Sequence, residues 1–387
     1  MENLQKTIAA IAGNSTPLNR NGIEKVLILY EERIDFIGDC CLRFGRFKYF
    51  SLYFNSPFIQ INFTHKANAK FHQGLLKNSP YINRVSEQRW DDLDLPSFDA
   101  VLCVMYNEEK FLEFLDRKYG AQIAGGSFPL AVYSMSEIIL PTLPLTPFSA
   151  FKFTQDADMV QYLTVVKPAE LYISEEEQRW ADQWLGSKGL GEGEDLFVVL
   201  DSASSRDKVL GITVYFEFLK SILQDGNAKV LIFDENTIGK EEFYRQWLGD
   251  ETADRIIFSK GLSLRDNLCL IGSRHTRLVV GPCTGLMHCA SSIYNNYVSN
   301  GMDPRDVPLI VVYTGQYSKA NKSAHYWWEG APLVNCLLLK AKNNRKEVVL
   351  LSSLPDAERE LNDTLPCRDY TAGLLTEFIH RKMSVSA

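Results

Sequence analysis

The sequence LVVGPCTGLMHCASSI at residues 278–293 predicts a buried strand, a tight turn and a helix in immediate succession. The apolar run 278–280 is typical of a strand, Gly281, Pro282 and Cys283 form the turn, and Thr284 opens the helical pattern. The first N–H groups of a helix lack intrahelical partners, and the helix dipole places partial positive charge beside them. The pattern therefore indicates a phosphate site at the start of the helix, with an ordinary strand–helix unit of a parallel sheet as the alternative.

The composition of the whole chain is that of a soluble globular protein, with 45% hydrophobic and 23% charged residues. A chain of 387 residues is long enough for two domains, each with its own core. The net charge of −7 argues against a nucleic-acid-binding protein. The first residues lack the pattern of a signal peptide, and no apolar run is long enough to span a membrane. We therefore expect a cytoplasmic protein with at most peripheral membrane contact.

Strand patterns alternate with helical patterns along both halves of the chain, which predicts an α/β fold with parallel sheets. In the first half the expected strands are 25–30, 58–63, 98–106 and 131–135, and a polar loop with Gly38 and Asp39 follows the first of them. In the second half the expected strands are 196–202, 229–234, 255–260, 276–281 and 308–315, and an amphipathic helix, 371–383, closes the chain. Ligands of such sheets bind beyond the carboxyl ends of the strands.

The segment 137–172 is rich in proline and lacks periodicity, so it predicts an extended crossing between two domains, 1–172 and 173–387. Ser174 is followed three residues later by Glu177, which predicts a capping box at the start of a helix. Ser263 is expected to cap a later helix.

The run VVGPCTGLMHCASSI resembles the donor-site signature of the heptosyltransferases, glycosyltransferase family 9. The resemblance extends over most of the chain, roughly residues 25–330, and is most specific at residues 284–288. It implies the GT-B fold, in which two Rossmann-like domains with parallel sheets face each other across a cleft. Residues 1–172 would then form the acceptor-side domain, and residues 173–387 the nucleotide-sugar donor domain with a closing C-terminal helix.

The resemblance implies catalytic roles for Asp39 and Lys208. Sugar transfer needs a base that takes the proton of the acceptor hydroxyl. The family carries its proposed base in a Gly-Asp pair after the first strand, which Gly38 and Asp39 match. Without the resemblance, Asp39 would be interpreted as a turn carboxylate that caps the next helix. Lys208 matches a family lysine that contacts the donor phosphates.

Hydroxyl, cationic and backbone groups in two segments form the predicted donor site. Serines and cations after the strand 196–202 suit a departing diphosphate, although a solvated loop explains them as well. His288 would donate to the diphosphate or to a sugar hydroxyl, unless it is a core histidine bonded to a backbone carbonyl. The predicted diphosphate-binding residues are Ser204, Ser205, Arg206, Thr284, Gly285, Leu286, Met287 and His288.

Cys283 departs from the family pattern, because the family usually has Asp at this position. A thiol supplies neither the charge nor the acceptor capacity of a carboxylate. Either the contact with the donor differs here, or the activity is weakened or lost.

Acceptor and metal sites are less strongly indicated. Lys66 and Arg46 are the candidate acceptor-binding residues, within a group of cations near Asp39 that also includes Arg43. The acidic runs 91–94 and 156–158 are similar to the metal motif of another glycosyltransferase fold, but Asp156 is expected to open a helix. The eight cysteines include no CxxC pair and are expected to be buried free thiols. We therefore expect no essential metal, and no cofactor besides the nucleotide-diphospho-sugar that serves as co-substrate.

The resemblance implies an inverting glycosyltransferase, which we expect to be metal-independent. It would move a heptose-like sugar from a nucleotide-diphospho-sugar to a hydroxyl of a glycan, a lipid-linked glycan or another acceptor of the lipopolysaccharide type. Two alternatives stay open. One is a catalytically weakened or inactive GT-B binding protein, which Cys283 favours. The other is a different GT-B sugar-nucleotide enzyme, such as an epimerase or a hydrolase.

Overall fold

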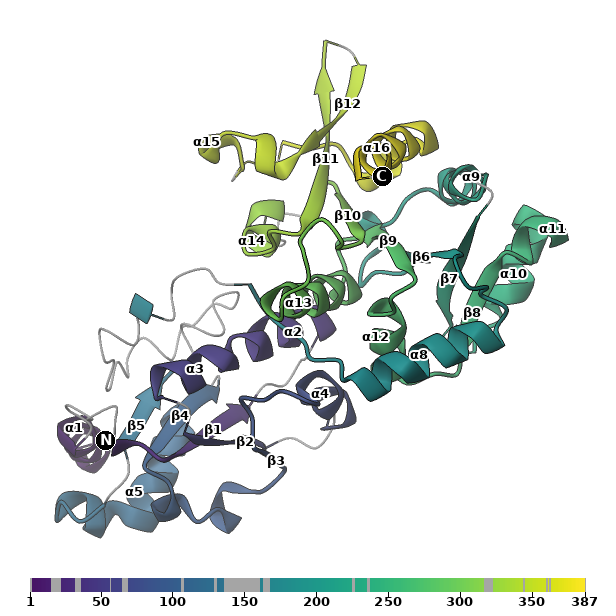
Figure 1. Cartoon of the computed structure of the whole chain (residues 1–387). Helices are drawn as coiled ribbons and strands as arrows, with labels where there is room; N and C mark the ends of the chain where they lie inside the picture. Colours follow the sequence, from purple (N-terminus) through teal and green to yellow (C-terminus); the bar gives the residue numbers. More distant parts are fainter. Residues whose placement is uncertain are drawn as a thin grey trace. The chain divides into compact units, whose positions relative to one another are not determined.

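The computed structural model divides the chain into two compact units, Met1–Lys167 and Pro168–Ala387 (Figure 1). The second unit begins before the expected boundary at residue 173, because the N–H of Leu171 bonds the carbonyl of Ser292 at 3.0 Å, inside the second unit. The residues described are 2–14, 22–31, 36–55, 57–64, 69–105, 108–128, 131–135, 161–162, 168–224, 227–234, 237–316, 323–343, 345–359, 361 and 363–386.

The first unit contains a five-stranded parallel sheet with the strand order β3-β2-β1-β4-β5. The four strands expected from the sequence are confirmed, and the short β3 is an addition. All of β4 is buried, as expected for a parallel strand covered on both faces. The strands are β1 (Lys25–Glu31), β2 (Phe58–Phe63), β3 (Arg84–Ser86), β4 (Ala100–Met105) and β5 (Ala131–Ser134).

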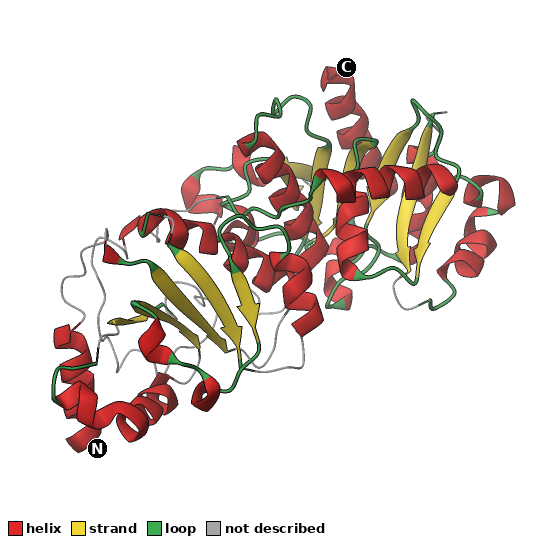
Figure 2. Cartoon of the chain, turned by 60° about the horizontal axis from the view of Figure 1, so that its bottom comes forward, coloured by secondary structure: helices red, strands yellow, loops and turns green. Residues whose placement is uncertain are grey.

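Helices flank these strands (Figure 2). They are α1 (Glu2–Asn14), α2 (Ile37–Gly45), α3 (Phe47–Tyr53), α4 (Ala69–Leu76) and α5 (Glu108–Ala124), with short 3-10 turns η3 (Trp90–Asp92) and η4 (Leu95–Ser97).

The expected loop at Gly38 and Asp39 is wrong, because both residues lie in the first turn of α2. Cys40, Cys41 and Phe44 are buried at helical spacing and hold this segment against the sheet.

The second unit contains a seven-stranded sheet with the order β12-β11-β10-β9-β6-β7-β8, parallel except for the β11–β12 pair. The five expected strands are confirmed. The hairpin β11–β12 was not predicted, and its turn carries Asn343 at φ 49°. The strands are β6 (Asp195–Val199), β7 (Ala228–Asp234), β8 (Ile256–Lys260), β9 (Thr276–Pro282), β10 (Leu309–Thr314), β11 (Val334–Lys342) and β12 (Arg345–Leu350).

The helices of this unit lie on both faces of its sheet (Figure 2). Ser174 forms the expected capping box of α8. Ser263 caps α12 as expected, and the structure shows a capping box with Asp266 there. The helices are α8 (Glu175–Ser187), α9 (Ile212–Ile222), α10 (Lys240–Leu248), α11 (Asp250–Ala253), α12 (Leu264–Ile271), α13 (Gly285–Ser299), α14 (Ala324–Trp328), α15 (Asp356–Arg359) and α16 (Ala372–Ser386), with 3-10 turns η6 (Arg206–Lys208), η7 (Leu351–Ser353) and η8 (Cys367–Asp369).

Both sheets have a topological switch point. In the first unit the chain leaves β1 toward β2 and leaves β4 toward β5, on opposite sides. In the second unit the neighbours β6 and β9 have the same relation. The connections diverge there, and α/β sheets bind ligands beyond the carboxyl ends of the strands at such a point.

Candidate functional site

The switch point of the second unit brings the two predicted donor segments together. Val199 of β6 lies beside Val280 of β9, and the N–H of Leu200 bonds the carbonyl of Val280 at 2.9 Å. A Cβ on Gly281 would lie 2.7 Å from the Cβ of Leu200, so this close approach requires glycine. The segment after Leu200 and the start of α13 therefore emerge from the same edge of the sheet.

The N-terminus of α13 is open. Thr284 is the N-cap residue, but its side chain makes no capping hydrogen bond. The carbonyl of Thr284 accepts from Met287 and His288, whereas the N–H groups of Gly285 and Leu286 have no acceptor among the described residues. The N-caps of α8 and α12 in the same unit are closed by serine capping boxes. Unlike them, α13 presents free donors and the positive end of its dipole.

His288 is buried against an aromatic ring. Its side chain stacks on Trp328 with ring centroids 4.0 Å apart and planes 9° apart. Burial, and after it the nearby charge of Lys208, together lower the pKa of His288 to about 3. The imidazole is thus neutral at neutral pH and has one N–H to donate. Lys208 lies close enough to His288 for its charge to act on the imidazole.

The 201–208 segment ends in the 3-10 turn η6. The hydroxyl of Ser205 accepts from the N–H of Asp207 at 3.3 Å and so caps this turn. Ser204 and Arg206 are exposed, whereas Lys208 is half-buried. Lys208 is therefore the residue of this segment that the structure places beside α13, while Ser205 has a structural partner of its own.

Cys283 is a buried thiol between β9 and α13, with 4% of its surface exposed. Burial, and after it the neighbouring Cys283, together raise the pKa of Cys367 to about 12. The pKa of Cys336 is raised in the same way, by burial first and by Cys283 second. Cys283 thus belongs to a group of buried thiols, and all eight cysteines are free, as expected.

In the first unit, Asp39 lies beside a buried arginine of the same helix. An Nη of Arg43 is 4.0 Å from the carboxylate of Asp39, and the other donates to the hydroxyl of Tyr30 at 3.1 Å. Arg43 is 5% exposed, so it supports Asp39 from within the unit rather than facing solvent as an acceptor-binding cation would. The sequence pattern groups Arg43 with those cations, and the structure corrects this interpretation.

The other predicted polar residues of the first unit have mixed outcomes. Arg46 is half-buried at the junction of α2 and α3. Lys66 and the acidic run 156–158 lie outside the described residues.

Glu108, which the sequence analysis missed, starts α5 after β4. It is 1% exposed and accepts a 2.6 Å hydrogen bond from Ser134. Its position after a buried strand was the available signal, but its burial indicates a structural role.

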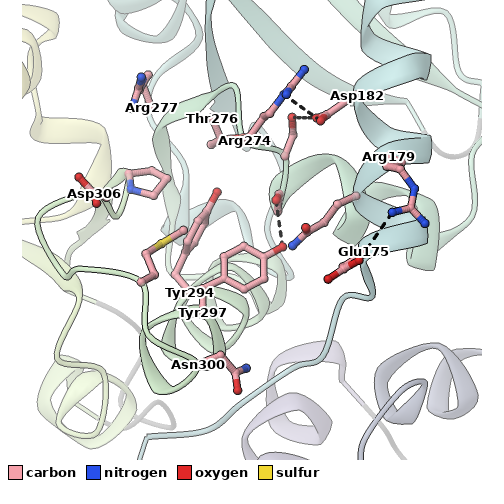
Figure 3. Close-up of a pocket in the computed structure, with 15 residues that line it drawn as sticks. Glu175, Arg179, Asp182, Arg274, Thr276, Arg277, Tyr294, Tyr297, Asn300 and Asp306 are labelled. Carbon is pink, nitrogen blue, oxygen red and sulfur yellow. Dashed lines mark hydrogen bonds and ion pairs between the residues drawn. The ribbon is translucent and has the colours of Figure 1, made fainter.

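A separate pocket of about 580 Å³ lies at the amino edge of the second sheet (Figure 3). Its polar groups bond one another: Arg274 pairs with Asp182 at 3.0 Å, and the hydroxyls of Tyr294 and Tyr297 donate to backbone carbonyls at 2.8 and 3.0 Å. It contains none of the predicted site residues. The carboxyl edge, rather than this pocket, is the candidate functional site.

Within the described part of the chain, no group of three or more histidine, cysteine, aspartate or glutamate residues is placed to hold a metal ion. Asp91 of the acidic run 91–94 lies in η3, 3.9 and 3.8 Å from the guanidinium groups of Arg89 and Arg117.

No protein-family model matches the chain. No curated protein sequence matches it either. Among solved structures, E. coli ADP-heptose LPS heptosyltransferase II is similar with a TM-score of 0.59 and 13% identity, over 94% of this chain and 100% of that one. A glycosyltransferase of family 9 from Veillonella parvula has a TM-score of 0.50 and 15% identity, over 78% and 83% of the two chains. The E. coli heptosyltransferase WaaC with ADP has a TM-score of 0.50 and 12% identity, over 94% and 99%. The two-unit α/β architecture expected for a GT-B fold is confirmed by these likenesses.

Proposed function

We propose that this chain is an inverting, metal-independent glycosyltransferase of the heptosyltransferase type. It moves a heptose-like sugar from a nucleotide-diphospho-sugar to a hydroxyl of a glycan or lipopolysaccharide-type acceptor. The observation that carries the proposal is the uncapped N-terminus of α13 beside Lys208, in a fold shared with heptosyltransferase II. That combination suits a diphosphate leaving group.

The leaving diphosphate gains charge as the bond to the sugar breaks. The N–H groups of Gly285 and Leu286, the hydroxyl of Thr284 and the ammonium of Lys208 stabilise that charge. Neutral His288 adds one donor. Leu286 and Met287 are buried, 9% and 0% exposed, so their side chains anchor the helix, and the N–H of Leu286 is left for the ligand. Ser204, Ser205 and Arg206 supply outer contacts from the segment that carries Lys208.

Asp39 accepts the proton of the attacking acceptor hydroxyl in a single displacement, which inverts the anomeric configuration. Its side chain is 21% exposed and therefore reachable, while Arg43 beneath it is 6% exposed.

We place the reaction in the cytoplasm, with peripheral contact to a membrane where the acceptor is lipid-linked. None of the helices in the described ranges has the length and hydropathy needed to cross a bilayer.

A binding protein without turnover is the second candidate, favoured by the buried thiol of Cys283 where the heptosyltransferase signature has a carboxylate. A GT-B epimerase or hydrolase is the third, and would consume the donor without an acceptor.

The test separates chemistry from binding. Asp39→Asn should lower the transfer rate by about 10²–10⁴-fold and keep ADP affinity, since it removes only the base. Lys208→Ala should lower both. Affinity is measured by calorimetry with ADP, and rate by ADP release from ADP-heptose with a lipopolysaccharide-derived acceptor. Asp91→Asn, a half-exposed aspartate of the same unit, is the matched control.

Transfer at the wild-type rate by Asp39→Asn would remove Asp39 from the mechanism. Donor consumption without acceptor would support the epimerase or hydrolase. ADP binding without transfer, with transfer gained in Cys283→Asp, would support the inactive binding protein.

A further inference from the structure

The pocket of about 580 Å³ at the amino edge of the second sheet, which we call the amino-edge pocket, takes no part in the proposed reaction (Figure 3). It is lined by α8, by the turn between α12 and β9 with the start of β9, by the C-terminal half of α13 and by the segment that leads to β10. All of these belong to the second unit. Small-molecule sites typically have volumes of about 300–1,000 Å³, so the amino-edge pocket is large enough for a ligand of its own.

Two tyrosines give the amino-edge pocket a fixed shape. The hydroxyls of Tyr294 and Tyr297 donate to the carbonyls of Ile271 and Gly272, which ties α13 to the end of α12. Burial raises the pKa of both hydroxyls, so they stay protonated and keep donating. A Cβ on Gly272 would lie 2.7 Å from the hydroxyl oxygen of Tyr297, so glycine permits this close approach. The pocket is therefore preformed, as small-molecule sites usually are.

The formal charges that line the amino-edge pocket cancel, because three arginines and three acidic residues line it. Two of the arginines, Arg179 and Arg274, pair with lining carboxylates at 3.7 and 3.0 Å. The third, Arg277, pairs at 3.2 Å with Asp195, which is outside the lining. A lining in which the charges are paired and balanced gives no strong preference for an anion or a cation.

The helix ends at the amino-edge pocket do not favour a phosphate. The pocket meets α12 and α13 at their C-cap residues, Gly272 and Asn300, where the helix dipole places partial negative charge. The N-terminus of α8 also borders the pocket, but a capping box closes it. The amino-edge pocket therefore lacks the open helix N-terminus that characterises the proposed phosphate site.

Donors and acceptors of hydrogen bonds both remain around the pocket. Arg277 donates to Asp195 through Nε, and its two terminal nitrogens make no hydrogen bond within the described residues. Asn300 donates to the carbonyl of Asn296 at 3.0 Å, which leaves its side-chain oxygen as an acceptor. The carboxylate of Glu175 is largely exposed, so it also accepts. Figure 3 shows these groups spread around the pocket rather than gathered at one point.

We propose that the amino-edge pocket binds an uncharged sugar unit of a glycan, at a site separate from the reaction centre. Each sugar hydroxyl donates one hydrogen bond and accepts two, so several hydroxyls match a neutral lining with both kinds of group. Met302 and Pro308 add apolar surface on which the C–H groups of a sugar ring pack. Because α13 begins at the proposed phosphate site and ends at this pocket, a donor and a sugar unit can bind at the same time.

Calorimetry on the full chain tests this proposal. The probes are neutral oligosaccharides prepared from lipopolysaccharide, free of lipid, phosphate and acidic sugars, and this choice of probe rests on the proposed function. Saturating ADP is present throughout, so that the proposed donor site is filled. Under these conditions the wild type should bind the neutral oligosaccharides and should not bind inorganic pyrophosphate.

Two arginines on different sides of the amino-edge pocket supply the variants (Figure 3). Arg179→Met and Arg277→Met keep an unbranched side chain and remove every donor, at side chains that are 66% and 58% exposed. Each variant should weaken oligosaccharide binding at least about tenfold, the loss of a hydrogen bond from a charged group. Arg305→Met is the matched control, because Arg305 is an exposed arginine that pairs with Asp303 at 2.6 Å and does not line the pocket.

Absence of oligosaccharide binding by the wild type overturns the sugar site. Unchanged affinity in both variants also overturns it, because the sugar then binds elsewhere. Pyrophosphate binding that both variants weaken would make the pocket an anion site and has the same consequence. Failure of the wild type to bind ADP removes the proposed function instead, and the sugar site stands if oligosaccharide binding depends on Arg179 and Arg277.

Discussion

His288 shows how far residue chemistry can be predicted at the candidate site. Its place at the start of the helix after β9 follows from the sequence pattern. Its stacking on Trp328 does not, because Trp328 comes from α14, and contacts between distant elements are decided by packing rather than by local pattern. Arg43 makes the same point in the first unit, since only the fold shows that it is buried beneath Asp39.

The depressed pKa of His288 gives a stability prediction. Between its ordinary value of 6.5 and its folded value of about 3, the unfolded chain binds a proton that the folded chain excludes. The stability contribution is therefore complete above pH 6.5 and is lost as the pH falls. From pH 6.5 to pH 5 the loss is up to about 2 kcal/mol.

Urea unfolding at pH 7.5 and pH 5 measures this loss, and His288→Gln should show a smaller drop than the wild type. Carboxylates titrate in both proteins, so the difference between the two drops isolates His288. Equal drops in both proteins would show that His288 titrates normally in the folded state.

At the scale of helices and strands, the sequence predicted structure well where it contained a complete local motif. Ser174 with Glu177 gave a correct capping box. The Gly38–Asp39 pair was assigned to a loop because glycine and aspartate favour turns, yet the buried face of Cys40, Cys41 and Phe44 decided for a helix. The hairpin β11–β12 was missed, although Asn343, a residue type that favours turns, follows its first strand.

Because α13 lacks a side-chain cap, a substitution that supplies one should raise the stability of the free protein and lower its ADP affinity. Thr284→Asp supplies a side-chain acceptor to the free N–H groups and a charge that suits the dipole, so the free protein should gain about 0.5–2 kcal/mol. The same carboxylate occupies the anion site and repels a diphosphate. ADP affinity should fall at least about tenfold, which corresponds to 1.4 kcal/mol.

Ser263→Ala is the matched control, because it removes a cap from a neighbouring helix of the same unit. It should lose about 1 kcal/mol of stability and keep its ADP affinity. Denaturant unfolding and calorimetry on both variants measure the two effects. Wild-type ADP affinity in Thr284→Asp would mean that no anion binds at α13.

At the scale of the whole molecule, the alternation of strands and helices predicted two parallel sheets, and the strand orders gave each a switch point. The boundary between the units was less predictable, because residues 168–172 read as part of a proline-rich crossing. Their hydrogen bonds place them in the second unit. Asn295 donates to the carbonyl of Ala169 at 3.0 Å, and Asn296 and Ser299 bond the buried carboxylate of Glu170 at 3.3 and 2.9 Å.

These bonds predict that a fragment of residues 168–387 is more stable than one of residues 173–387. Both fragments contain the proposed donor site and the core of the second unit. In the shorter one, three side chains lose the hydrogen-bond partners that residues 169–172 provide: Asn295, Asn296 and Arg265. A buried polar group without its partner costs about 1–3 kcal/mol, so the shorter fragment should lose at least about 3 kcal/mol in urea unfolding. The longer fragment should also bind ADP like the full chain, because every proposed phosphate contact lies within it. Equal stability of the two fragments would show that residues 168–172 belong to the crossing after all, and that the unit begins where its first helix does.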